Sequence, residues 1–153
     1  MGWSSEQQKR LGFEKVVLET YFKAKGKVRW IDPTVCGGTK VEVQMKTSNS
    51  RDFTLRVYLS KDFPNSCPEM VVCSPSTPLV KNDGRTLSGV SGTDHTLGTK
   101  DGMTKICHFR PEKWTSDNTL YQVFMKGLIW LEAYEGHRAS GEPISNFLKE
   151  FSL

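Results

Sequence analysis

The sequence lacks the features that mark membrane and secreted proteins. No apolar run approaches the length of a membrane span, and the first residues show no basic-then-apolar signal pattern. Met1-Gly2 is not followed by the Ser or Thr that a myristoylation site needs, because Glu6 stands there. We therefore expect a soluble, cytoplasmic protein that makes no membrane contact.

Paired cysteines and blocks of basic charge are missing as well. The four cysteines, Cys36, Cys67, Cys73 and Cys107, contain no C-x-x-C pair, which argues against a zinc ribbon and a dithiol redox motif. The net charge of +4 is mild, and the basic residues are spread along the chain. We expect no metal, no other cofactor and no nucleic-acid partner.

What the sequence does contain is a pattern for α+β structure. The chain of 153 residues has enough apolar residues for its own core, so we treat 1–153 as a single domain. Ser5 and Gln8 form a capping box, after which apolar residues recur at helical spacing. This predicts an amphipathic first helix, broken at Gly26, with the apolar positions Leu11, Val17, Leu18, Tyr21 and Phe22.

The next part of the chain alternates apolar and polar residues with the period of a β-strand. Turn residues at 32–38 and 48–50 separate three such runs, and the two prolines within 62–68 interrupt the pattern before a short apolar run at 69–73. We expect a four-stranded antiparallel meander with a covered centre. The apolar positions of the first three runs are Val28 and Trp30; Val41, Val43 and Met45; and Phe53, Leu55, Val57 and Leu59.

Between residues 74 and 102 the periodicity disappears, and Pro, Gly, Ser, Thr and Asp dominate. We expect a long loop, and a loop of this length in a compact domain is usually functional or mobile. It contains His95, which is either polar surface or part of a site.

One thiol stands out by its position in the segment 105–114. Cys107 lies between a strand-like run and the strongest helix pattern, with Ile106 and Phe109 as candidate buried anchors and Trp114 as an attachment to the core. Because a cysteine at such a junction is more exposed than one in mid-strand, Cys107 is the candidate nucleophile. The alternative is a buried cysteine that acts as a small apolar residue.

Two helices are expected at the C-terminal end. Thr119 and Gln122 form a second capping box, which opens a helix over 120–135. Gly127 lies in its apolar stripe and costs about 1 kcal/mol of helix propensity relative to alanine, which predicts a close approach to the sheet or to another helix. Pro143 is expected to begin a short last helix with the apolar residues Ile144, Phe147, Leu148 and Phe151.

This order of elements resembles the ubiquitin-conjugating enzyme family. The likeness is sharpest in Phe63-Pro64-x-x-x-Pro68 and in the spacing from Ile106-Cys107 through Trp114 to Thr119-Leu120. It implies the ubiquitin-conjugating-like fold and a ubiquitin-like protein-conjugating enzyme. In such an enzyme Cys107 accepts the modifier as a thioester from an activating enzyme and passes it to an amine of a protein substrate.

The resemblance assigns roles to further residues. His95 resembles the His of the family's His-Pro-Asn motif, and Glu142 resembles an acidic residue that orients or deprotonates the incoming amine. Lys9, Arg10 and Lys15 lie on the first helix, which in this family docks the activating enzyme. Taken without the resemblance, Glu142 is a solvated acid near a helix start, and the three basic residues form a solvated face.

The chain also departs from the family pattern. Thr and Leu follow His95 where the family has Pro and Asn, so the Asn credited with supporting the oxyanion is missing. We expect backbone N–H groups around Gly98 to replace it, with Asn118 or water as alternatives. Asn65 and Ser116 lie in segments that other members present to RING-type ligases, and they differ from the residues usual there. The use of a ligase is therefore open.

Transfer of a modifier through a thioester requires few residues. An unperturbed thiol with a pKa of about 8.5 is already a few per cent ionised near neutral pH, so one accessible cysteine is enough. In an extended segment neighbouring side chains point to opposite faces, so we do not expect His108 to act as a base for Cys107.

Two functional classes remain. The helix end Trp130-Leu131-Glu132-Ala133-Tyr134-Glu135 is similar to that of divergent conjugating enzymes encoded in bacterial operons with ubiquitin-like and activating-enzyme genes. That similarity implies that no ligase need exist and suggests antiviral defence. The alternative is a catalytically inactive conjugating-enzyme variant or an RWD-like protein-interaction module, in which Cys107 is incidental.

Overall fold

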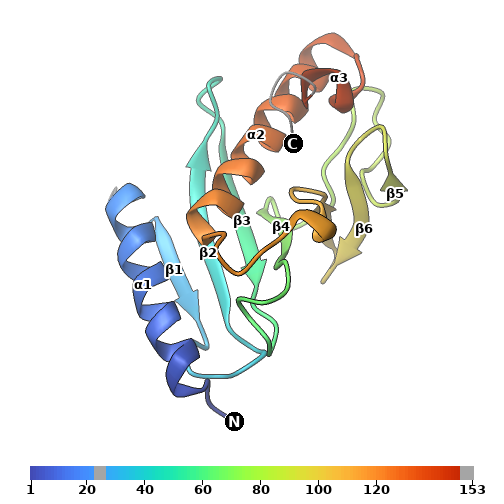
Figure 1. Ribbon diagram of the computed structural model, residues 1–153. Helices are drawn as coiled ribbons and strands as arrows, with labels where there is room; N and C mark the ends of the chain where they lie inside the picture. Colours follow the sequence, from blue (N-terminus) through green and yellow to red (C-terminus); the bar gives the residue numbers. More distant parts are fainter. Residues whose placement is uncertain (23–26, 149–153) are drawn as a thin grey trace.

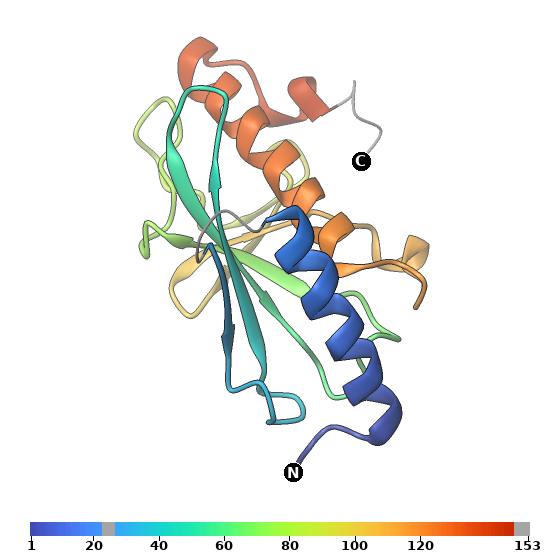
Figure 2. The same cartoon turned by 90° about the vertical axis from the view of Figure 1, so that its left-hand side faces the viewer.

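The computed structural model describes residues 1–22 and 27–148, which form an α+β arrangement (Figure 1). Helix α1 (Ser5–Tyr21) comes first, an antiparallel sheet follows, and helices α2 (Leu120–Ser140) and α3 (Ile144–Leu148) come last. Figures 1 and 2 show α1 and α2 on the same face of the sheet. The expected α+β order is confirmed, while Gly26 and Phe151 lie outside the described residues.

Within the described residues, the sheet has seven antiparallel strands in the order β1-β2-β3-β4-β7-β6-β5. The first four form the expected meander, but the prediction of four strands in total was wrong. The strands are β1 (Val28–Ile31), β2 (Lys40–Lys46), β3 (Asp52–Tyr58), β4 (Glu69–Ser74), β5 (Val90–Ser91), β6 (Thr96–Lys100) and β7 (Met103–Ile106).

The additional strands lie largely in the segment that we expected to be a long loop. Strands β6 and β7 form a hairpin around Asp101 and Gly102, which both have the left-handed backbone conformation that a tight two-residue turn requires. Threonine supplies β-branched residues to both strands, at positions where an alternating sequence would carry valine or isoleucine. The hydrophobic period is therefore weak, although the Asp-Gly pair was a usable signal.

The core forms where alternate residues of β2, β3, β4 and β7 meet α2. Gly127 lies at the closest approach, because a Cβ atom there would be 2.6 Å from Leu55 Cδ1 and 2.6 Å from Met70 Sδ. The predicted close contact between helix and sheet is confirmed. The fully buried residues of this layer include Val41, Val43, Leu55, Val57, Met70, Ile106, Phe124, Trp130 and Leu131.

The ends of the long helices differ in part from the sequence pattern. The first capping box is Ser4 with Gln7, one residue before the expected pair, because the preceding Trp3 is buried and donates its Nε1–H to Thr39 Oγ1 at 2.9 Å. The second box, at the start of α2, is confirmed. Helix α2 continues past the expected end at residue 135 and is capped by Gly141 at φ 82°.

The remaining segments between β7 and the C-terminal residues are short. A 3-10 turn, η1 (Pro111–Lys113), lies between β7 and α2, and α3 begins directly after Pro143 as expected. In the part of the chain that the structure describes, no helix combines the length and apolar character needed to span a bilayer.

Candidate functional site

Cys107 lies immediately after β7, where the sheet gives way to the loop that leads to α2. Its N–H donates to the carbonyl oxygen of His95 at 2.9 Å, which extends the pairing of Thr96 with Ile106 by one residue. Its side chain is half-buried, whereas Ile106 beside it is fully buried. The expected position at a junction of strand and loop is confirmed, and the backbone of the thiol-bearing residue is anchored.

The charges around Cys107 act on its thiol in opposite directions. Burial raises the pKa of Cys107 above its ordinary value, Arg110 lowers it, and Glu112 raises it. In the free chain the group is therefore a protonated thiol near neutral pH. A partner that brings a further cation close to Cys107 would favour the thiolate. A partner that shields Arg110 from water more than Glu112 would do the same, because the attraction of Arg110 for the thiolate would then be strengthened more than the repulsion from Glu112.

His95 contacts Cys107 through its backbone carbonyl oxygen. The residue has a left-handed conformation at φ 53°, and its side chain is half-buried. Burial lowers the pKa of its imidazole first, and the charge of Arg110 lowers it further, so the ring is neutral near pH 7. The structure thus brings the predicted pair together, with the His95 carbonyl oxygen in contact with Cys107.

The groups proposed to replace the missing Asn already have partners. Gly98 has φ 88° and lies in the irregular stretch of β6 between Thr96 and Thr99, but its N–H donates to the carbonyl oxygen of Gly89 at 3.3 Å. The side-chain amide of Asn118 donates to the carbonyl oxygen of Thr115 at 3.3 Å. Either group would have to leave its partner before it could stabilise an oxyanion at Cys107.

A second thiol and an imidazole, which the sequence did not single out as a pair, lie next to this site. The Sγ of Cys67 is 4.0 Å from Nε2 of His108, whose ring is buried with Nδ1 3.4 Å from the carbonyl oxygen of Ile106. Burial, and to a smaller extent the nearby thiol of Cys107, raise the pKa of Cys67 to about 11. His108 therefore contacts Cys67, in line with the expectation that it does not serve Cys107.

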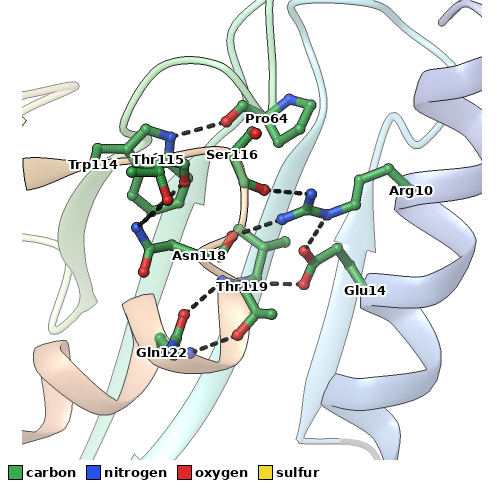
Figure 3. A network of polar contacts seen from close by, with 10 residues as sticks. Arg10, Glu14, Pro64, Trp114, Thr115, Ser116, Asn118, Thr119 and Gln122 are labelled. Carbon is green, nitrogen blue, oxygen red and sulfur yellow. Dashed lines mark hydrogen bonds and ion pairs between the residues drawn. The ribbon is translucent and has the colours of Figure 1, made fainter.

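Arg10 is partly buried and bonds to other parts of the chain, so it is not the fully solvated residue expected for that face of the first helix (Figure 3). Its guanidinium donates to Glu14 Oε2 at 2.7 Å and to the carbonyl oxygens of Ser116 at 2.5 Å and Asn118 at 2.6 Å. The other oxygen of the fully buried Glu14 accepts the N–H of Leu120 at 2.9 Å. Together they tie α1 to the loop before α2.

The other two basic residues of α1 lie on its exposed side. Lys9 is exposed and forms a surface ion pair with Glu6 at 3.6 Å, and Lys15 is exposed. Phe13 and Val16 lie on the same side and are 54% and 63% exposed. The exposed part of α1 is therefore mixed, basic and apolar.

The two loops expected to face a ligase are neighbours. Trp114 donates its Nε1–H to the carbonyl oxygen of Pro64 at 2.9 Å, which joins the segment containing Ser116 to the segment containing Asn65 (Figure 3). Asn65 is exposed, with its N–H bonded to the carbonyl oxygen of Asp62 at 2.7 Å. The prediction that Trp114 attaches the cysteine loop to the core is confirmed.

Glu142 lies in the connection between α2 and α3, and its backbone is tied to α2. Its carbonyl oxygen accepts from His137 Nδ1 at 2.7 Å, and its N–H donates to Ser140 Oγ at 3.1 Å. The side chain is exposed. These contacts explain how the connection is held, and they involve neither Cys107 nor His95.

No family model, curated protein or solved structure matches this chain. Across residues 1–22 and 27–148, no three histidine, cysteine or acidic side chains are grouped as a metal site would require. The candidate site is the segment around Cys107, a half-exposed cysteine whose backbone N–H is bonded to the His95 carbonyl oxygen.

Proposed function

We propose that this chain has the ubiquitin-conjugating-like fold and acts as a ubiquitin-like protein-conjugating enzyme through Cys107. The observation that carries the proposal is the position of that thiol, half-exposed at a strand end with its N–H bonded to the His95 carbonyl oxygen. The arrangement holds the backbone still while leaving the sulfur reachable. The order of helix, meander, cysteine loop and covering helix supports the same assignment.

The reaction has two acyl transfers. The Cys107 thiolate attacks the carbonyl carbon of the modifier's thioester, a new C–S bond forms, and the thiolate of the activating enzyme leaves. An amine of the substrate protein then attacks the same carbon, the C–N bond forms, and the Cys107 thiolate leaves. The amine gives up one proton to a base, for which Glu142 stays a candidate only if the connection before α3 moves toward Cys107.

The oxyanion of the second step needs a hydrogen-bond donor. Gly98 lies in β6 where its pairing with β7 is irregular, between Thr96 and Thr99, and its 3.3 Å bond to Gly89 is on the opposite, β5 side of the strand. We assign it as the donor that is released when a modifier binds. The exposed side of α1 with Lys9 and Lys15 is the proposed docking surface for the activating enzyme, and Arg10 supports that helix from within.

The test is formation of a reductant-sensitive adduct. The chain is mixed with its candidate activating enzyme, the modifier and ATP, and separated on a gel with and without reductant. A band at the summed mass should disappear with reductant and be absent in Cys107→Ala. The control is Cys73→Ala, since Cys73 lies at the end of β4 with a thiol whose pKa burial raises to about 11. Loss of the band in the control but not in Cys107→Ala would refute the assignment.

A second candidate is a non-catalytic protein-interaction module of the same fold. The observation that favours it is the occupied state of both donor candidates, together with a Cys107 pKa that burial raises. In that case the exposed side of α1 and the loops of Asn65 and Ser116 are binding surfaces only. The absence of any adduct, with an activating enzyme that loads another acceptor under the same conditions, would select this alternative.

A further inference from the structure

The aromatic ring of Phe109, two residues after Cys107, lies between a second aromatic ring and a cation. The ring centroids of Phe109 and Trp114 are 5.3 Å apart, with the ring planes at 78°. The Nζ of Lys126 lies over the ring of Phe109, 5.0 Å from its centroid. Both arrangements are attractive, because the face of an aromatic ring is electrically negative and its edge is positive. Phe109 therefore ties the loop after Cys107 to both neighbours.

Both neighbours of Phe109 belong to the packed part of the fold. Trp114 is buried and donates its Nε1–H to the carbonyl oxygen of Pro64 at 2.9 Å (Figure 3). Lys126 lies in α2 directly before Gly127, where that helix comes closest to the sheet. The ring of Phe109 is therefore held on two sides by residues whose own backbone is anchored.

The ring of Phe109 stands where a lysine often has a carboxylate. Lys126 is half-buried and forms no ion pair with an acidic side chain of residues 1–22 and 27–148. Its positive charge therefore has an aromatic face as its partner. Burial lowers the pKa of His108, and the charge of Lys126 lowers it further, so this charge also acts on the loop after β7.

Arg110 comes directly after Phe109 and is anchored on its other side as well. Its carbonyl oxygen accepts the N–H of Lys113 at 2.9 Å, at the start of η1. The backbone of Arg110 therefore lies between the ring contacts of Phe109 and a hydrogen-bonded turn. The residue is exposed, so the distance of its guanidinium from Cys107 depends on where that backbone is held.

The charge of Arg110 acts on the Cys107 thiol. The titratable groups around that thiol are Cys67 before β4, His95 before β6, Lys126 in α2, and His108, Arg110 and Glu112 after β7. Burial raises the pKa of Cys107, Arg110 lowers it, and Glu112 raises it. Both histidines are neutral near pH 7, because burial lowers the pKa of each. Arg110 is therefore the cation that favours the thiolate.

We propose that Lys126 and Phe109 are positioning residues for the Cys107 thiolate, because their contact holds Arg110 at the distance at which its charge stabilises the sulfur anion. Without the contact the loop after Cys107 is free to shift, and the guanidinium moves into solvent. The importance of this contact for acyl transfer rests on the proposed function. The thiolate is measured in the chain alone, so the contact and the conjugating activity can fail separately.

The test measures the rate at which iodoacetamide alkylates Cys107 between about pH 6 and pH 10, by mass spectrometry of the peptide that contains it. Lys126→Met removes the cation, so the pH profile should move to higher pH and the rate near pH 7 should fall about 3-fold. Lys126→Arg keeps a cation over the ring and should restore the parent profile. A parent profile in Lys126→Met, or no rescue by Lys126→Arg, would overturn the proposal.

A second substitution separates the ring contact from a direct effect of the Lys126 charge on the thiol. Phe109→Leu keeps an apolar side chain without the ring and should slow alkylation near pH 7 by a similar factor. The double variant with Lys126→Met should be no slower than the slower single variant, because both changes remove the same contact. A further fall in the double variant would mean that Lys126 acts on Cys107 by its own charge, which would overturn the positioning role.

Arg110→Gln tests the last step. It should slow alkylation near pH 7 about 3-fold, and the addition of Lys126→Met should have no further effect. Because Arg110 is exposed, this change leaves the core untouched and keeps the proposal testable if Phe109→Leu is destabilised. Lys46→Met, at an exposed position of β2, is the matched control for the loss of one lysine charge and should react as the parent does. A parent rate in Arg110→Gln would overturn the proposal.

Discussion

At the residue scale, burial decides the state of the histidine next to the cysteine. His108 is 4% exposed, and burial lowers its pKa to about 4. In the unfolded chain its pKa is close to 6.5, so between pH 6.5 and pH 4 the unfolded chain binds more protons than the folded one. The free energy of unfolding therefore falls as pH is lowered through that range, and His108 contributes its full stabilisation only above pH 6.5.

We expect the His108→Phe variant to lose much of this acid sensitivity. In the parent, the His108 shift lowers the free energy of unfolding by roughly 3 kcal/mol between neutral pH and pH 4. Carboxylates add a further pH dependence, which is the same in the parent and in the variant. Urea unfolding at several pH values measures the difference. His95→Gln is the control, since His95 is only half-buried, and it should keep most of the parent's slope. Equal slopes for the parent and His108→Phe would contradict the prediction.

The four thiols should differ in reactivity. Burial raises the pKa of Cys67 and of Cys73 to about 11, so at pH 8 only about 0.1% of either is thiolate. Cys107 has a raised pKa too, but Arg110 opposes the increase. All four thiols are partly exposed, and we expect Cys107 to be alkylated more rapidly than Cys67 and Cys73 when limiting iodoacetamide is followed by mass spectrometry. Cys107→Ser is the control for peptide assignment, and earlier labelling of Cys36, Cys67 or Cys73 would count against the catalytic role.

At the scale of elements, the contact between α2 and the sheet depends on one missing side chain. A Cβ atom at Gly127 would overlap Leu55 and Met70, whereas a Cβ atom at Gly12 in α1 would have, among residues 1–22 and 27–148, no group within 4 Å apart from its chain neighbours and the nearby backbone of its own helix. Both glycines lie inside a helix, so they share the same gain in helix propensity on substitution.

We expect Gly127→Ala to destabilise the protein by about 1–3 kcal/mol, because overpacking outweighs the propensity gain. Gly12→Ala should stabilise it by about 0.5–1 kcal/mol. The midpoints of urea unfolding measure both changes, provided that the dependence of the unfolding free energy on urea concentration is the same in the parent and the variants. A stabilised Gly127→Ala variant would mean that α2 can move away from the sheet at little cost.

At the scale of the whole molecule, charged groups connect α1 with the loop before α2 and with the start of α2. Arg10 and Glu14 on α1 bond to Ser116, Asn118 and Leu120, more than a hundred positions further along the sequence (Figure 3). Glu14 is fully buried and supplies acceptors to both the guanidinium and the first N–H of α2. Removal of that carboxylate leaves the buried N–H of Leu120 without a partner and takes from Arg10 its charged partner, so that only the carbonyl oxygens of Ser116 and Asn118 still accept from the guanidinium.

We expect Glu14→Ala to cost about 3–5 kcal/mol in unfolding free energy, as for other broken buried pairs. Glu6→Ala is the matched control, because Glu6 pairs with Lys9 on the surface, and it should stay within about 1 kcal/mol of the parent. Arg10→Glu should also destabilise, whereas Lys9→Glu with Lys15→Glu should not. Thermal unfolding followed by circular dichroism separates these outcomes, and a stable Glu14→Ala variant would refute the internal role of the pair.

Local patterns explain what could be predicted before the structure. The alternation in Phe53, Leu55 and Val57 and the Thr119–Gln122 box each depend on neighbours a few residues apart, so they identified the meander and the start of α2. The same reasoning missed β6, since threonine and lysine carry no clear apolar period. It also placed Arg10 on the surface, because nothing local distinguishes a solvated arginine from one that bonds to a distant loop.

The sequence by itself determined the α+β order, the junction that holds Cys107 and the need for a close contact at Gly127. These follow from periodicity, capping and turn chemistry, which act over a few residues. Only the tertiary structure decided that His95 faces Cys107 through its carbonyl oxygen, that Gly98 has a partner in Gly89, and that Asp94 keeps one oxygen unpaired. Each of these depends on which distant strands and loops become neighbours, since desolvation and hydrogen bonding act through space rather than along the chain.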